Sequence, residues 1–222
     1  MLNNGSFNTL KNINYQKTSK RMRMDELDKA IRPHGGYRKL RSFQTAQMVY
    51  DATVIFCDRF IEKTSRTRDQ MVQAARSGVQ NIAEGSMASV TSKKTELKLT
   101  GVARASLEEL LLDYEDFLRQ RKLRIWPKDS PEAIAVRKRY RSDKSDRSDK
   151  SDRSDPYLIR TTDAETAANT LICLINQASF LLGRQIRKLE ESFANEGGFS
   201  ERLYQMRSQR RRIGRDRRGG RS

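Results

Sequence analysis

The chain has 222 residues, which suits one domain with tails or at most two domains. Its residues are 36% hydrophobic and 33% charged, enough for one helical core but not for two large ones. The formal net charge is +17 at pH 7, and no hydrophobic run approaches the ~18 residues of a membrane span.

Residues 1–38 are polar and basic, and we expect them to be flexible. A first helix is predicted over residues 39–63, because hydrophobic residues recur there at spacings of three and four. The predicted stripe consists of Phe43, Ala46, Tyr50, Val54, Cys57 and Ile61, and it is widened by Val49, Phe56 and Phe60. This width predicts packing against two neighbouring helices.

A second helix is predicted over residues 67–84. Thr67 and Gln70 have the spacing of a capping box, and Gly85 is expected to end the helix in the left-handed conformation. One face holds only small residues, Ala74, Ala75, Ser77 and Gly78. A glycine inside a helix costs about 1 kcal/mol relative to alanine, so this face predicts a close approach by another helix.

Two longer helices follow, near residues 91–123 and 163–195. Thr91 or Ser92 is the expected cap of the third, and its stripe is Ala103, Leu107, Leu110, Tyr114 and Phe117, broadened by Leu111 and Leu118. Thr162 and Glu165 have capping-box spacing before the fourth, and Gly197-Gly198 is expected to close it. Its seam is nearly unbroken and consists of Ala164, Ala168, Leu171, Ile175, Ala178, Leu182, Ile186 and Leu189.

Residues 128–160 are predicted to be a low-complexity insertion between the third and fourth helices. Within it, Arg141 to Asp155 consists of five triplets in which a basic residue precedes Ser and Asp. A period of three without hydrophobic residues predicts disorder. A transient helix is the alternative, because Asp143 and Arg147, and the equivalent later pairs, have helical i, i+4 spacing. Each triplet is neutral, which argues against the insertion as the main phosphate contact.

Most of the positive charge lies at the two ends of the chain. Residues 1–39 hold nine basic and three acidic residues, and residues 200–222 hold nine and two, which leaves +4 for residues 40–199. Basic tails beside a compact domain are typical of nucleic-acid binding, although tails that only increase solubility are the alternative. The candidate phosphate contacts in the tail are Arg202, Arg207, Arg210, Arg211, Arg212, Arg215, Arg217, Arg218 and Arg221. Those in the helical part are Lys93, Lys94, Lys98 and Arg104, with Arg119, Arg121, Lys122 and Arg124 at the far end of the third helix.

Three motifs resemble a known family. They are Ala-Ala-Arg-Ser-Gly from Ala74, Gln-Asn-Ile-Ala-Glu-Gly from Gln80 and Ala-Arg-Ala-Ser-Leu-Glu-Glu-Leu from Ala103, and Pro33 to Lys39 also has a counterpart. They resemble the four-helix-bundle proteins encoded in 23S rRNA intervening sequences, a group that includes the accessory variability proteins of diversity-generating retroelements, and above all its "four helix bundle suffix" branch. The resemblance implies a small helical bundle that assembles into a homo-oligomeric ring, expected to be a pentamer, binds nucleic acid and has no enzyme activity.

The family motif includes Arg76, Asn81, Glu84 and Gly85. Asn81 and Glu84 share a helix face with Ser77, and Arg76 lies near them. They have two possible roles, which are contact with a nucleotide or partner chain and hydrogen bonding to the next helix. We favour the structural role, because a polar group near a tight helix crossing needs a partner.

Catalytic and metal-binding signals are weak. His34 is the one histidine and has no nucleophile at a suggestive spacing, the Glu-x-x-His pairs of a di-iron bundle are absent, and two separate cysteines form neither a metal site nor a disulfide scaffold. The helical carboxylates leave a Mg²⁺-dependent nuclease as a third, weaker hypothesis. We therefore expect no cofactor, no catalytic residue and no resident metal, and a cytoplasmic location, because the N-terminus lacks the hydrophobic region of a signal peptide.

The sequence thus predicts an all-α fold, an up-down-up-down four-helix bundle over residues 39–199, with flexible basic segments at 1–38 and 200–222. The expected function is that of a nucleic-acid-binding accessory protein, with RNA favoured over DNA, and a reverse transcriptase encoded by the same element is an expected partner. The alternative is a protein-interaction scaffold whose basic tails contact an acidic partner.

Overall fold

The computed structural model describes residues 36–142 and 157–196 together with Glu201, Tyr204, Arg207 and Ser208. Within these residues the chain forms a short 3₁₀ helix, five α-helices and no strand, which confirms the all-α prediction. The elements are η1 (Gly36–Lys39), α2 (Arg41–Phe60), α3 (Arg66–Ala88), α4 (Lys93–Gln120), α5 (Pro131–Ser142) and α6 (Ala164–Glu196).

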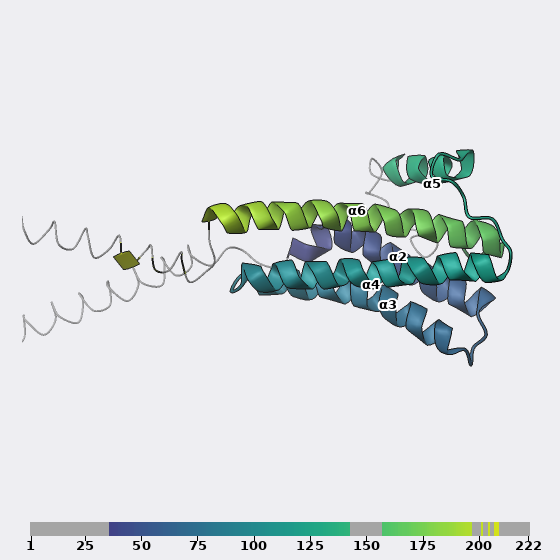
Figure 1. Ribbon diagram of the computed structural model, residues 1–222, viewed down its shortest axis with the longest axis horizontal. Helices are drawn as coiled ribbons and strands as arrows, with labels where there is room; N and C mark the ends of the chain where they lie inside the picture. The colour runs from purple at the N-terminus through teal and green to yellow at the C-terminus, as the bar shows by residue number, and fades with distance from the viewer. Residues whose placement is uncertain (1–35, 143–156, 197–200, 202–203, 205–206, 209–222) are drawn as a thin grey trace, which may run out of the picture.

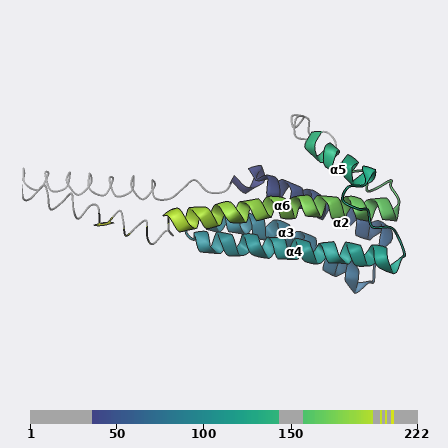
Figure 2. The same ribbon diagram turned by 45° about the horizontal axis from the view of Figure 1, so that its top comes forward.

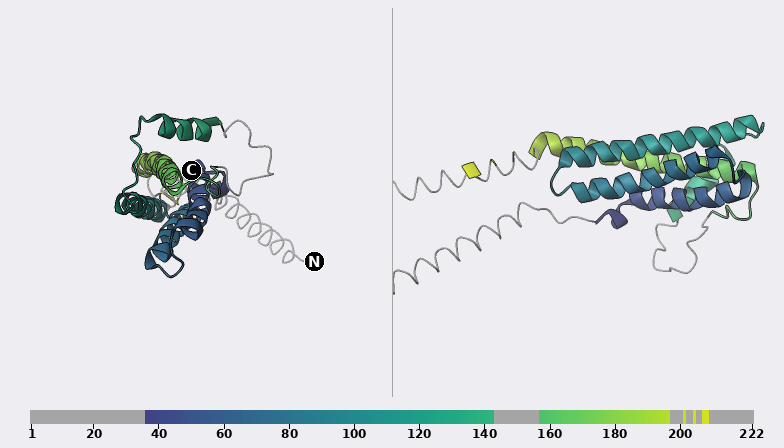
Figure 3. Two further views of the ribbon diagram at one scale, coloured as in Figure 1. Left: turned by 90° about the vertical axis from the view of Figure 1, so that its right-hand side faces the viewer. Right: turned by 90° about the horizontal axis from the view of Figure 1, so that it is seen from below.

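The four long helices α2, α3, α4 and α6 lie alongside one another (Figures 1 and 2). Each packs against two others, in the order α2, α3, α4, α6 and back to α2. A single hydrophobic core cluster, with Phe56, Tyr114 and Leu171 among its members, joins all four. The shorter α5 lies outside this group and packs on α6 (Figure 3).

The buried row of α2 differs from the predicted stripe. Tyr50 and Val54 were expected at its centre but are only half-buried, whereas Val49 and Phe56 are fully buried. Phe56 packs edge-on against Tyr114 and Phe117 of α4, with ring centroids 4.9 and 4.8 Å apart. Helix α2 contacts both α3 and α6. Packing against these two helices, and not the number of hydrophobic residues in each row of side chains, therefore decides which row is buried.

Both predicted ends of the second helix are wrong. The cap of α3 is Ser65, whose hydroxyl accepts a hydrogen bond from the Thr67 amide at 3.3 Å, so the Thr67–Gln70 capping box does not form. Gly85 does not end the helix, which continues to Ala88. Gly85 is instead buried against α4, where a Cβ atom would lie 3.3 Å from the Glu96 carbonyl oxygen and from Leu99 Cβ.

The close approach predicted from the small-residue face is confirmed. A Cβ atom at Gly78 would lie 2.9 Å from Leu107 Cδ2 and 3.0 Å from Leu107 Cγ, so α4 uses the space that glycine leaves. The small face therefore serves packing inside one chain. It gives no independent reason to expect an interface between chains, and neither do Val49 and Phe56, which are buried in the same core.

The stripe of α4 and the central seam of α6 are buried as predicted. Ser92 caps α4, because its hydroxyl accepts from the Thr95 amide at 3.1 Å. The helix ends at Gln120, before the predicted residue 123, since Lys122 adopts a left-handed conformation with φ 58°. The Leu123 amide then bonds to the Leu118 carbonyl at 2.9 Å, which is the pattern of a Schellman motif.

The predicted capping box of α6 is also wrong. The Asp163 carboxylate caps the helix by accepting from the Thr166 amide at 2.9 Å, and this hydrogen bond lowers the pKa of Asp163. Glu165, the expected partner of Thr162, instead accepts a hydrogen bond from the Arg124 amide at 3.0 Å. A partner on another segment therefore displaces the local pairing.

Helix α5 corrects the prediction of a low-complexity, disordered insertion at residues 128–160, because it occupies Pro131–Ser142. Ser130 caps it by accepting from the Ala133 amide at 3.2 Å, and Pro131 occupies the first turn, where its missing N–H costs nothing. Tyr140 is buried and shares a 2.7 Å hydrogen bond with Thr45 of α2. Tyr157 and Ile159 are buried as well, whereas the triplets from residue 143 to 155 lie outside the described residues.

One helix in the described part of the chain, α6, is long and apolar enough to pass a length-and-composition test for a membrane span. Half of its most apolar window is buried inside the protein. The fully buried residues Leu171, Ile175 and Leu182 belong to the hydrophobic core cluster shared with α2, α3 and α4. A helix that packs against other core helices on two sides has equally high hydropathy, so packing in the core explains why α6 passes this test.

Candidate nucleic-acid interface

The first turns of α4 present two of the predicted phosphate contacts. Lys94 and Lys98 are exposed, on a helix that begins at the Ser92 cap. Lys93 was predicted to contact phosphate beside them. Its side chain is instead only 6% exposed, and its Nζ donates to the Ser192 hydroxyl of α6. Lys93 therefore holds α4 and α6 together and is not available to a ligand.

Glu96 lies one helical turn after Lys93 on α4. Partial burial raises its pKa, and the charge of Lys93 partly opposes this effect. The positive charge of Lys93 thus acts on Glu96, and the surface charge in this region comes from Lys94 and Lys98.

Arg104, the fourth predicted contact in the helical part, is exposed and extends across to α6. Its Nη1 would lie 3.8 Å from a Cβ atom built at Gly183, so the guanidinium lies beside the glycine. Phe180 and Arg187 lie one turn to either side of Gly183, and Arg184 follows it. All three side chains are exposed, and the prediction from sequence did not include them.

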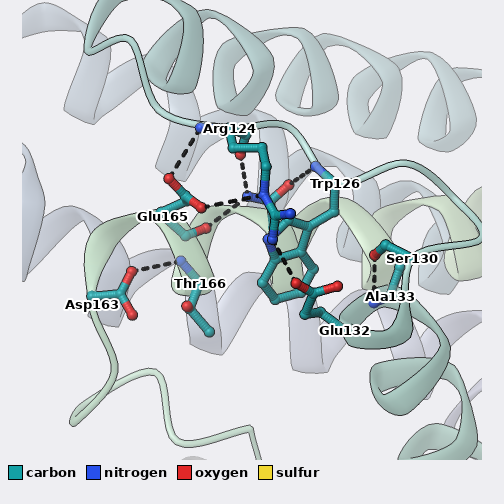
Figure 4. A network of polar contacts seen from close by, with 9 residues as sticks. Arg124, Trp126, Ser130, Glu132, Ala133, Asp163, Glu165 and Thr166 are labelled. Carbon is teal, nitrogen blue, oxygen red and sulfur yellow. Dashed lines mark hydrogen bonds and ion pairs between the residues drawn. The ribbon is translucent and has the colours of Figure 1, made fainter.

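The arginines at the other end of α4 are engaged within the protein. Arg119 forms an ion pair with Asp116 at 2.7 Å, and the Arg121 guanidinium lies over the Phe117 ring, 3.9 Å from its centroid. Arg124 forms ion pairs with Glu132 at 2.5 Å and Glu165 at 3.8 Å (Figure 4). These contacts make them weaker candidates for phosphate than Lys94, Lys98 and Arg104.

Asn169 completes the contacts around Arg124. Its side chain donates to the Arg124 and Glu165 carbonyls at 2.8 and 2.9 Å and accepts from the Trp126 amide at 2.7 Å. Asn169 is 1% exposed, so its buried amide finds hydrogen-bond partners in the backbone groups of these three residues. This cluster fixes the segment that leads from α4 into α5.

The family-motif residues fall into two groups. The Asn81 side chain donates to the Ser77 carbonyl at 2.9 Å, and the Ser77 hydroxyl shares a 2.9 Å hydrogen bond with Ser106 of α4. With Gly85 packed on the same helix, these contacts support the structural role that we favoured. Arg76 and Glu84 are exposed and make no ion pair within the described residues.

An open polar groove of about 450 Å³ lies between α3 and α4. Asp69 and Glu109 supply its carboxylates, and Arg66 supplies a positive charge. The described part of the chain contains no group of three or more His, Cys, Asp or Glu side chains placed to hold a metal ion. The groove has no feature that assigns it a reaction.

Neither cysteine is a prepared nucleophile. Burial raises the pKa of Cys57 to about 12 and also raises the pKa of Cys173. Both thiols are free, and Cys57 is completely buried in the hydrophobic core. His34 lies outside the described residues.

Only Arg207 of the nine predicted arginines in the C-terminal tail is described, and it is exposed in a helical segment. The other eight lie outside the described residues. The 3₁₀ helix η1, the C-terminal end of α6 and the start of α4 all lie at the same end of the molecule (Figure 1). The Ser42–Gln185 hydrogen bond of 2.7 Å and the Lys93–Ser192 contact link the three helices there.

Comparison of the chain with protein-family models, curated proteins and solved structures finds no match. The resemblance to the intervening-sequence proteins therefore stays an expectation based on the three sequence motifs.

Proposed function

We propose that this protein is a non-enzymatic nucleic-acid-binding accessory protein, with RNA the favoured ligand. The observation that carries the proposal is the uneven charge, because +13 of the net +17 belongs to residues 1–39 and 200–222. In the helical part, Lys94 and Lys98 are exposed in the first turns of α4, at the end of the molecule where η1 begins and α6 ends, and Arg104 is exposed farther along α4. Phosphate contacts there release counterions, which favours binding to any nucleic acid.

The proposal includes the topology of the four long helices and their assembly into a ring. We infer that α2, α3, α4 and α6 form an up-down-up-down four-helix bundle, supported by their cyclic packing order and by the short connections on either side of α3. The family resemblance supports a homo-oligomeric ring, with a pentamer expected, that assists a reverse transcriptase. The proposed location is the cytoplasm. A neighbouring gene for a reverse transcriptase with a template repeat would support that partner.

The experiment is a salt titration of RNA binding by the full chain and by a chain truncated after Gly198. If about five tail arginines contact phosphates, log affinity should fall against log salt with a slope of roughly −3.5 to −4.5. Truncation should weaken binding strongly and flatten the slope. An unchanged affinity and slope would contradict the role of the tail and move the contact to the helical body.

A protein-interaction scaffold is the second candidate, and exposed hydrophobic residues favour it. Leu112, Met87 and Val102 are 58, 48 and 40% exposed on α3 and α4. A scaffold would bind its protein partner with affinity that depends little on the tails' phosphate contacts. Binding of the full chain to a protein partner but not to RNA at low salt would favour this alternative.

A further inference from the structure

The outer side of α6 carries an exposed aromatic ring among arginines. Phe180 is 57% exposed, although it lies in the middle of a helix whose opposite side forms the core. Arg184 follows it by one turn, Arg187 by two, and Arg104 of α4 reaches the same place beside Gly183. We call Phe180, Arg184, Arg187 and Arg104 the α6 patch.

The arginines of the α6 patch are free of acidic partners within the described residues. Glu108 and Glu191 lie one helical turn after Arg104 and Arg187, but neither forms an ion pair with them. The arginines at the far end of α4 differ, since their guanidinium groups contact Asp116, Phe117 and Glu132. The α6 patch therefore combines three available cations with an apolar ring that faces solvent.

We propose that the α6 patch binds single-stranded RNA, with one unpaired base stacked on Phe180 and the neighbouring phosphates held by Arg104, Arg184 and Arg187. This rests on the proposed function and adds a preference for unpaired strands. A base in a duplex is already stacked on its neighbours, whereas an unpaired base can leave the stack and lie on an aromatic ring. Stacking needs no base-specific hydrogen bond, so the patch selects single strands without selecting sequence.

A second copy of this chain is the other binding partner that an exposed phenylalanine could contact. Charge argues against a two-fold contact between α6 patches, because it would bring three arginines of each copy together, and the light-scattering mass of the Phe180 variant tests a contact with a different surface of another copy. RNA supplies the opposite charge and a flat apolar ring in one ligand.

The test measures binding of the full chain to a 20-nucleotide uridine RNA and to an RNA duplex of the same length. Phe180→Leu keeps a hydrophobic helix-forming side chain but removes the ring. It should weaken single-strand binding by roughly 5- to 150-fold, which corresponds to about 1–3 kcal/mol of stacking, and leave duplex binding and the salt slope unchanged. Phe180→Trp should preserve or increase single-strand affinity.

Two further variants separate stacking from charge and from general effects. Arg184→Gln with Arg187→Gln should make the salt slope for single strands about 1.4 less negative, the value for two phosphate contacts. Phe193→Leu is the matched control, since Phe193 is 38% exposed near the end of the same helix and lies on a different side from Phe180. It should leave both RNA affinities unchanged.

Three outcomes would overturn the inference. If Phe180→Leu binds single strands as tightly as the wild type, the α6 patch makes no stacking contact, while the proposed function stands on the salt dependence. If Phe180→Leu lowers the light-scattering mass, the patch is an interface between copies. If the wild type binds neither RNA at low salt, the inference and the proposed function fail together.

Discussion

Gly78 and Gly85 decide how closely α3 approaches α4. At both positions a Cβ atom would lie within 3.4 Å of an α4 atom, a side-chain carbon of Leu107 or the Glu96 carbonyl oxygen. Gly101 of α4 differs, because a Cβ atom there would meet nothing within 4 Å. The same residue type therefore serves packing at two sites and costs helix stability at a third.

This contrast gives a prediction for stability. Gly101→Ala should raise the free energy of unfolding by about 1 kcal/mol, because alanine replaces the poorer helix former in open space. Gly78→Val should lower it by about 1–3 kcal/mol, since the added carbons overlap Leu107. Urea unfolding followed by circular dichroism measures both. Equal effects of the two changes would show that α3 and α4 are not in close contact at Gly78.

Cys57 provides a second test at a single residue. With a pKa of about 12, the buried thiol is ionised in about one molecule in ten thousand at pH 8. In a Cys173→Ser variant, the remaining thiol should resist a thiol-specific reagent in the native protein and react fully in guanidinium. Rapid native labelling would contradict the burial of Cys57 between α2 and its neighbours.

At the scale of elements, α5 is held from both ends. Arg124 and Glu132 join its first turn to the end of α4, and Tyr140 joins its last turn to Thr45 of α2. Asn169 of α6 organises the segment between α4 and α5 through backbone groups of Arg124 and Trp126. The position of α5 thus depends on polar contacts as well as on the buried side chains of Ala133 and Tyr140.

Asn169 should therefore matter more than a similar residue on the same helix. Asn169→Ala leaves the Trp126 N–H and the Arg124 carbonyl without their partner and should cost about 1–3 kcal/mol. Asn176 is the control, because it is exposed and bonds only to the Ile172 carbonyl of its own helix. Asn176→Ala should change stability by less than about 0.5 kcal/mol.

Hydrogen exchange gives the second measurement for this pair of variants. Amide exchange in residues 131–142 should accelerate in Asn169→Ala and stay at the wild-type rate in Asn176→Ala. Uniform acceleration across all helices in Asn169→Ala would show that Asn169 supports the whole core and not α5 in particular.

At the scale of the whole molecule, residues 40–199 carry only +4 of the net +17, and the remaining +13 belongs to the terminal segments 1–39 and 200–222. Among the described residues, the hydrophobic core cluster that includes the stripes of α4 and α6 consists of residues within 36–196. Nucleic-acid binding and assembly are therefore separable under the proposed function.

This separation predicts the behaviour of the chain truncated after Gly198. Its helicity and its oligomer number should equal those of the full chain, while its RNA affinity falls. Light scattering at micromolar concentration should give a multiple of the 25.7 kDa chain mass, five-fold for the proposed pentamer. A mass of 25.7 kDa for the full chain would contradict the ring. If the truncated chain forms a smaller oligomer than the full chain, the tail takes part in the interface between copies.

The sequence by itself determined the helical class, the buried stripes of α4 and α6, a cap at Thr91 or Ser92 and the close approach at Gly78, because periodicity, capping chemistry and small side chains act locally. The tertiary structure decided which row of α2 turns inward, the continuation of α3 past Gly85, the burial of Lys93 and the position of Arg104 beside α6. Each of these depends on a partner from a distant part of the chain. Local patterns show that a residue can take either of two roles, and only the packed neighbour selects one.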